Sequence, residues 1–179
     1  KDTTAPTIVE IQAWSWSLTS PANGSISSDV TPIVNLSGAA AENGGSIQVY
    51  DDAVCSSSKG SAQTIAAGAT AHNDISYLID GSQDGAKAFY AVATDAAGNV
   101  SACADISLGY TLDTSAPSVT IAAASSINLG NQASYSFNGS CSENGQPVVV
   151  SVGGVAPGVQ PTCTANAWSV TGLDVSALA

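Results

Sequence analysis

The residues of this chain that are best suited to chemistry are oxygen donors. The chain holds 14 aspartates and glutamates, only three lysines, no arginine and one histidine, and its formal net charge is -11. Carboxylate and amide oxygens are the ligands of calcium, which takes roughly six to eight of them. Calcium binding is therefore the first chemistry that the composition suggests, provided that the fold brings such residues together.

The four cysteines, Cys55, Cys103, Cys141 and Cys163, offer a second chemistry. No Cys-x-x-Cys segment occurs and only one histidine is present, which favours disulfides over a zinc site and predicts an oxidising compartment. Free buried thiols are the alternative. Three pairings are open from the sequence, and a division of the chain into two units predicts Cys55 with Cys103 and Cys141 with Cys163.

Other kinds of chemistry have little support. His72 has no nucleophile motif near it, so a Ser-His-Asp arrangement is not expected and the chain is predicted not to be an enzyme. A nucleic-acid partner is not expected either, because neutralising phosphates needs a basic patch. Apolar runs of about 18 residues are absent, so no membrane insertion is expected.

An internal repeat organises the chain. The segment 2–6, Asp-Thr-Thr-Ala-Pro, returns at 113–117 as Asp-Thr-Ser-Ala-Pro, and Glu-Asn-Gly at 42–44 returns at 143–145. The two Glu-Asn-Gly segments are closer together in the sequence than the two Asp-x-x-Ala-Pro segments are. The first unit therefore carries extra residues, and the simplest place for them is the segment around Trp14 and Trp16. The repeat predicts two domains, 1–112 and 113–179.

Alternating apolar and polar residues between turn signals predict an all-β chain. Strands are expected at 7–18, 32–38, 46–50, 62–67, 75–79, 86–94 and 104–112 of the first unit and at 148–152 and 168–170 of the second. This pattern is typical of two tandem Greek-key β-sandwiches of immunoglobulin type. The second sandwich is expected to be incomplete at its C-terminus, because the first unit has two more strands at the corresponding point.

Several motifs occur in a familiar order. The two Asp-x-x-Ala-Pro segments, Glu-Asn-Gly before a valine-rich strand, and Thr-Asp-Ala-Ala-Gly-Asn at 94–99 resemble the tandem bacterial Ig-like domains of large secreted or surface adhesins. Segments 141–148 and 172–178 fit the same family, and the resemblance covers nearly the whole chain. It implies an extracellular location, neighbouring Ig-like domains as partners, and calcium at domain junctions. The tryptophan insertion and the missing Asp-x-Ala-Gly-Asn segment of the second unit depart from the pattern.

An immunoglobulin sandwich gathers the start of its first strand and two of its loops at one pole. Acidic and amide residues fall at those places in the first unit, and others fall where the two units join. The candidate calcium ligands are Asp2, Glu42, Asp95 and Asn99 at the pole, and Asp113, Glu143, Asp80 and Asp84 at the junction. The alternative is that these residues stabilise turns by bonding to nearby backbone.

The expected function is a structural spacer or stalk segment of a bacterial adhesin, on the cell surface or secreted, stiffened by calcium. One alternative is a filament subunit whose second sandwich is completed by a strand from a neighbouring subunit. Another is a module that binds a host-surface glycan or protein through Trp14 and Trp16, which share one face of a predicted strand. Core packing is the other interpretation of these two rings.

Overall fold

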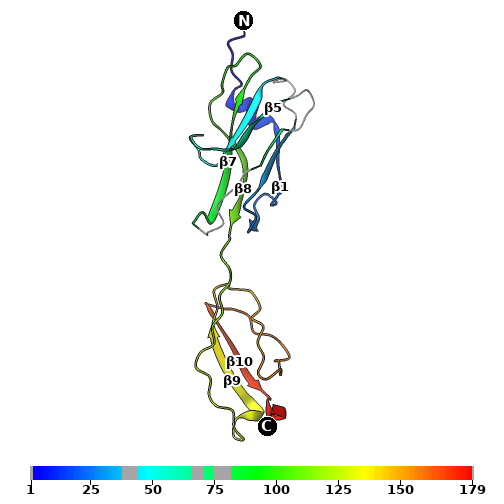
Figure 1. Ribbon diagram of the computed structural model, residues 1–179, viewed down its shortest axis with the longest axis vertical. Helices are drawn as coiled ribbons and strands as arrows, with labels where there is room; N and C mark the ends of the chain where they lie inside the picture. Colours follow the sequence, from blue (N-terminus) through cyan, green and yellow to red (C-terminus); the bar gives the residue numbers. More distant parts are fainter. Residues whose placement is uncertain (1, 38–43, 66–70, 75–81, 179) are drawn as a thin grey trace. The chain divides into compact units, whose positions relative to one another are not determined.

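The structure, a computed structural model, describes residues 2–37, 44–65, 71–74 and 82–178 (Figure 1). The chain forms two compact units, unit 1 (Lys1–Ser115) and unit 2 (Ala116–Ala179). Unit 1 extends through Ser115, past the predicted division between 112 and 113, and Thr114 and Ser115 are hydrogen-bonded to Asp84 of the same unit. The described elements are mostly strands, which confirms the all-β class.

The described residues of unit 1 form two β-sheets. The strands of the first sheet lie in the order β1-β3-β6, and those of the second in the order β2-β8-β7-β4-β5. Only the β2–β8 pair is parallel among the described pairs. The bounds are β1 Ser15–Ser20, β2 Ile26–Ser27, β3 Ile33–Ser37, β4 Ser46–Tyr50, β5 Ser58–Thr64, β6 Ala71–Asp74, β7 Gly85–Thr94 and β8 Ala104–Leu112.

The hydrophobic core of unit 1 lies between these sheets. Alternate residues of β7 point inward, so that Phe89, Ala91 and Ala93 are completely buried. They pack with Val34 and Leu36 of β3 from the other sheet. This inward and outward alternation is the pattern that identifies β3, β4, β7 and β8 in the sequence.

A short helix, α1 (Ile8–Ala13), replaces the first part of the strand predicted at 7–18. Its N-terminus is a capping box: the Glu10 amide donates to the Thr7 hydroxyl, and the Thr7 amide donates to the Glu10 carboxylate at 2.7 Å. The helix buries Ile11 in the core and leaves Val9 exposed. The strand prediction was wrong here because it took apolar residues on both faces as strand signals.

One further prediction differs from the structure in unit 1, and another cannot be compared with it. Strand β5 begins inside the predicted loop 51–61, because it is an edge strand whose residues are mostly exposed and polar. Such a strand is held mainly by its backbone bonds to β4 and has no apolar alternation to reveal it. The strand predicted at 75–79 lies outside the described residues, directly after β6.

Unit 2 is built around a two-stranded antiparallel sheet of β9 (Tyr135–Ser140) and β10 (Ala167–Leu173). Segment 118–122 runs beside β9, where the Thr120 amide donates to the Ser140 carbonyl at 3.0 Å. The predicted strand at 148–152 is not a regular strand; isolated bridges join Pro147 with Thr162 just before it and Val152 with Val155 at its end. Proline cannot donate to a ladder, which limits pairing at this point. Short 3₁₀ turns, Gln132–Ser134 and Ser176–Leu178, complete the unit.

The core of unit 2 is separate from that of unit 1 and is centred on Trp168. The ring of Phe137 meets that of Trp168 edge to face at 5.6 Å, and Val148, Val150 and Val175 pack in the same cluster. The Trp168 Nε1 donates to the carbonyls of both Thr120 and Ser140, each at 3.2 Å. Unit 2 therefore has a core and a hydrogen-bond network of its own.

Candidate functional site

Each unit contains one disulfide. Cys55 pairs with Cys103 in unit 1 and Cys141 with Cys163 in unit 2, at Cα–Cα distances of 5.7 and 6.0 Å. This is the pairing expected from the division of the chain into two units. The two disulfides indicate an oxidising environment, as expected for an extracellular protein.

Asp52 orders the loop that presents Cys55, and it was not among the residues predicted to be functional. Its carboxylate accepts hydrogen bonds from the amides of Val54, Ser56 and Ser57 at 3.0 to 3.1 Å. The backbone N–H groups of Ser56 and Ser57 stabilise the charged form and lower the pKa of Asp52. Aspartate followed by two serines after a short turn is the sequence signal that could have identified it.

Asp95 and Asn99, both candidate calcium ligands, lie together in the turn after β7. Asp95 Oδ1 accepts hydrogen bonds from the amides of Ala97 and Asn99 at 2.8 Å, and Oδ2 accepts one from the Asn99 side chain at 2.7 Å. These bonds, that of the Asn99 side chain first, lower the pKa of Asp95. Both oxygens thus already have local partners, which is the arrangement of a stabilised turn.

The other candidate carboxylates that the structure describes also accept hydrogen bonds locally. Asp2 accepts from the Thr4 amide at 2.9 Å, and Asp113 from the Ser115 amide at 3.1 Å. Glu143, which belongs to unit 2, accepts from the Ser142 hydroxyl at 3.2 Å. Glu42 and Asp80 lie outside the described residues. Within the described ranges, no three histidine, cysteine, aspartate or glutamate side chains are grouped closely enough to hold a metal ion.

Asp84 anchors the start of the segment that leads from unit 1 to unit 2. Its Oδ1 accepts hydrogen bonds from the amide and the hydroxyl of Thr114 at 2.9 and 2.8 Å, and its Oδ2 accepts one from the Ser115 hydroxyl at 2.9 Å. The register of β7 on β8 pairs Gly85 with Leu112, which brings Asp84 beside Thr114. We call Asp84, Thr114 and Ser115 the linker anchor. The Thr114 backbone N–H, first among these donors, lowers the pKa of Asp84.

Trp14 and Trp16 are half-buried and pack against the core of unit 1. Their ring centroids are 6.3 Å apart, and the Trp16 Nε1 donates to the Ile11 carbonyl at 2.8 Å. The pair therefore joins α1 to β1. Both residues remain partly exposed, and a binding role for them stays a prediction.

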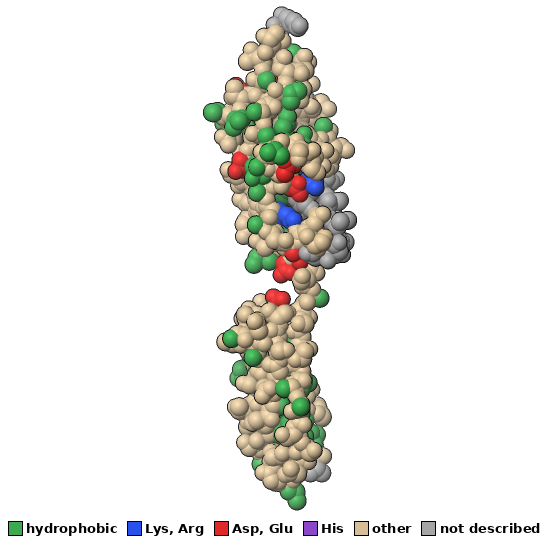
Figure 2. Space-filling view, turned by 90° about the vertical axis from the view of Figure 1, so that its left-hand side faces the viewer, with side chains coloured by type: hydrophobic (Ala, Val, Ile, Leu, Met, Phe, Trp, Pro, Cys, Tyr) green, Lys and Arg blue, Asp and Glu red, His purple; other side chains and the backbone are tan. Residues whose placement is uncertain are grey.

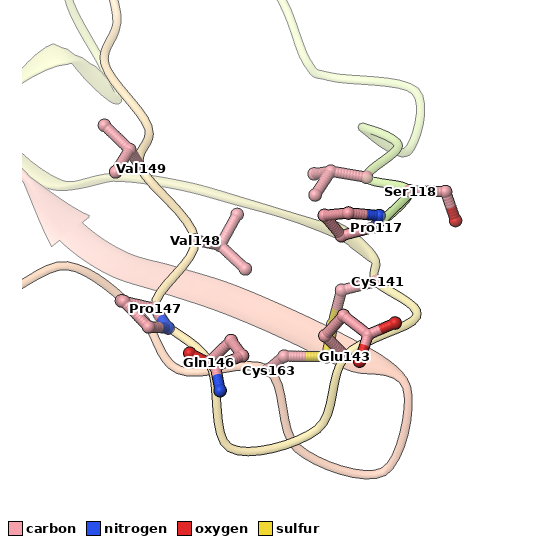
Figure 3. A pocket seen from close by; sticks show the side chains of 10 residues that line it. Pro117, Ser118, Cys141, Glu143, Gln146, Pro147, Val148, Val149 and Cys163 are labelled. Carbon is pink, nitrogen blue, oxygen red and sulfur yellow. A yellow bond between two sulfur atoms is a disulfide. The ribbon is translucent and has the colours of Figure 1, made fainter. Parts of the chain in front are cut away.

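Unit 2 has an apolar groove of about 490 Å³ between segment 117–119 and segment 146–149 (Figure 3). The disulfide lies at its base, and Val148 points into it while Val149 points away. Its apolar lining consists mainly of Pro117, Val119, Cys141, Pro147, Val148 and Cys163. The sequence predicts an incomplete second sandwich, but none of its motifs identifies this groove.

Charge is unevenly distributed over unit 1. Figure 2 shows acidic side chains at several places on one face of unit 1, with a few basic side chains among them. Lys59 forms an ion pair with Asp51 at 3.4 Å. A surface dominated by carboxylates favours solubility and cationic partners over anionic ones.

Comparison with models of known protein families and with curated proteins found no match for this chain. In the described part of the chain, no helix has both the length and the apolar character needed to cross a membrane.

Proposed function

We propose that the chain is an extracellular spacer, a stalk segment of a bacterial adhesin built from tandem immunoglobulin-like domains. The strand order of unit 1 supports the fold part of this proposal. β8, β7 and β4 are neighbours in one sheet, and β1, β3 and β6 form the other, which corresponds to a G-F-C sheet facing an A-B-E sheet. The parallel pairing of β2 with β8 fits a first strand that changes sheets.

The observation that carries the spacer role is the local structure of the repeated motif. In both copies the aspartate side chain accepts the amide two residues later, from Thr4 to Asp2 and from Ser115 to Asp113. The second copy is also held to unit 1 by the linker anchor. A motif whose turn is repeated before each apolar run, and whose second copy is fixed to the unit that precedes it, is suited to connecting modules in series.

The disulfides suit a segment that transmits force. Each closes a loop within its own unit, with sequence separations of 48 and 22 residues. A covalent loop limits how far a unit extends even after it unfolds.

Single-molecule force spectroscopy tests the proposal. A chain pulled from its ends should unfold in two separate events, because the two cores are independent. Reducing the disulfides should then lengthen the fully extended chain by about 170 Å for unit 1 and about 80 Å for unit 2, at roughly 3.5 Å per residue. A chain that extends without any resisted unfolding event would contradict a spacer role.

The proposal includes calcium binding at the two copies of the repeated Asp-x-x-Ala-Pro motif. Asp2 and Asp113 each use Oδ1 in the turn, and Oδ2 accepts no hydrogen bond from a described residue, so each carboxylate can still take a cation. Extracellular calcium modules bind with dissociation constants of about 0.1 to 1 mM, so millimolar calcium should stabilise the fold by about 0.4 to 1.4 kcal/mol.

Melting temperature in EDTA and in millimolar calcium measures this effect. The control is Asp113→Asn, which keeps an oxygen for the Ser115 amide but removes the charge. Equal melting temperatures in the two buffers would refute calcium binding and leave the spacer proposal to the pulling experiment.

A further inference from the structure

Segment 147–151 of unit 2 presents an unpaired β-edge. On one side it is held to residues 160–163: the Val148 amide donates to the Pro161 carbonyl at 2.8 Å, and the Val150 amide donates to the Gln160 side chain at 2.8 Å. Successive residues of an extended chain direct their amides to opposite sides. The amides of Val149 and Ser151 therefore face the other side, and no described residue is hydrogen-bonded to either of them.

The counterpart of this segment in unit 1 shows what that side pairs with. The internal repeat aligns Ile47, Gln48 and Val49 of β4 with Val148, Val149 and Val150. β4 is a central strand with β5 on one side and β7 on the other. Among the described residues of unit 2, segment 147–151 has a neighbouring segment, 160–163, on one side only. Position for position, the open edge is the one that β7 occupies in unit 1.

The groove beside the edge is bounded partly by residues of the core and partly by an exposed valine. Val148 and Val150 belong to the core of unit 2, yet Val148 also lines the groove, opposite Val119, which is 53% exposed. Residues 116–178 are described in full, and none of them fills the groove. Long unprotected edges next to exposed apolar surface are rare, because they attract other strands.

The pairing of β4 with β7 also defines the chemistry of a suitable strand. Ile47 lies opposite Ala93 and Val49 opposite Ala91, and both alanines are completely buried. Phe89, two residues before Ala91, is buried as well. A strand on the open edge would therefore need small apolar side chains opposite Val148 and Val150 and a larger apolar one beyond them.

We infer that the groove and the 147–151 edge form a strand-acceptor site. Its occupant is an extended segment of a partner polypeptide that carries small apolar residues at every second position, as β7 does. The strand pairs in antiparallel register with the amides of Val149 and Ser151 and covers Val119 and Val148.

Amide hydrogen exchange of the full chain tests the inference. The probe is a lysine-tagged peptide with the sequence of Gly85–Thr94, and the control is the same peptide with Ala91→Asp and Ala93→Asp. At saturating concentration, the β7 peptide should slow exchange of the Val149 and Ser151 amides about tenfold or more, whereas the control peptide should leave them unchanged.

Two matched variants locate the effect. Val119→Glu places a charge in the groove and should abolish the protection, whereas Val159→Glu makes the same change at an 86% exposed valine outside the groove and should preserve it. If Val119→Glu unfolds unit 2, the inference is tested by the difference in protection between the β7 peptide and the control peptide on the unsubstituted chain. No slowing, or equal slowing by both peptides, overturns the inference. The inference is also overturned if the chain without peptide forms a dimer in which the Val149 amide is already protected, because the occupant would then be a second copy of this chain. None of these outcomes affects the pulling experiment.

Discussion

Removing the disulfide of unit 2 should destabilise that unit by about 3 kcal/mol without affecting unit 1. Cys141 and Cys163 are 22 residues apart, and the chain-entropy relation for a loop of this size gives about 3.4 kcal/mol at 25 °C. Both side chains are buried, so alanine is the suitable replacement, because serine would bury a hydroxyl. At roughly 0.05 to 0.15 kcal/mol per residue, a unit the size of Ala116–Ala179 has a total stability of about 3 to 10 kcal/mol. The double variant Cys141→Ala/Cys163→Ala should therefore leave unit 2 marginal or unfolded.

The two units can be monitored separately in one urea titration by NMR. The Trp168 indole N–H reports on unit 2 and that of Trp16 on unit 1, because each is hydrogen-bonded within its own unit. The matched control is Cys55→Ala/Cys103→Ala. Its sequence separation of 48 predicts a loss of about 4.1 kcal/mol from unit 1 alone. If unit 2 loses less than about 1 kcal/mol in the first variant, or if both indole signals shift together, the reasoning from independent closed loops is refuted.

Three further outcomes are expected. Gly139→Ala should destabilise unit 2 by about 1 to 3 kcal/mol in the same titration, because a Cβ there would lie 1.8 Å from the Thr120 carbonyl oxygen; Gly158→Ala, whose Cβ would meet nothing within 4 Å, should be nearly neutral. Thr7→Ala should cost unit 1 about 1 kcal/mol by removing the capping box, and an unchanged urea midpoint for Trp16 would contradict this. The pKa of Asp84 in the folded chain is lowered from the ordinary aspartate value of 3.8. The linker anchor should therefore be complete above pH 3.8 and be lost as the pH falls through the lower folded pKa. The NMR shift of the Thr114 amide should titrate with a midpoint below pH 3.8, and Asp84→Asn should abolish that titration.

The sequence predicts those strands whose two faces have different surroundings. β4 spans the predicted residues 46–50, because Ile47 and Val49 must be apolar while their neighbours face outward. Helix α1 was missed because Ile8 and Val9 are apolar without being buried, so the alternation at 7–18 does not reflect a core. The helix signal was nevertheless present as Thr7 followed by Glu10, a capping box, and it should have outweighed a weak alternation.

The candidate site residues divide in a similar way. Asp95 and Asn99 meet because they are four residues apart in a turn, which the sequence can predict. Asp84 and Thr114 are 30 residues apart, and they meet only because of the register of β7 on β8. Composition and motifs cannot specify that register. The linker anchor therefore became visible only in the structure, although both of its partners lie in segments that the sequence analysis had singled out.

The acceptor site also sets a limit on how tightly a single strand can bind. Covering the exposed half of Val119 is worth about 1 to 2 kcal/mol, and each hydrogen bond to the Val149 and Ser151 edge adds about 1 kcal/mol. Association costs at least about 4 kcal/mol, so even four such hydrogen bonds leave a surplus of no more than about 2 kcal/mol, and a free peptide should bind no more tightly than the millimolar range. The exchange experiment therefore needs millimolar peptide. A partner that presents the strand as part of a folded sheet, or on a chain already tethered nearby, avoids much of that cost and should bind far more tightly. Tethering the β7 sequence to the chain through a flexible linker should thus protect Val149 at micromolar protein concentration, where the free peptide does not.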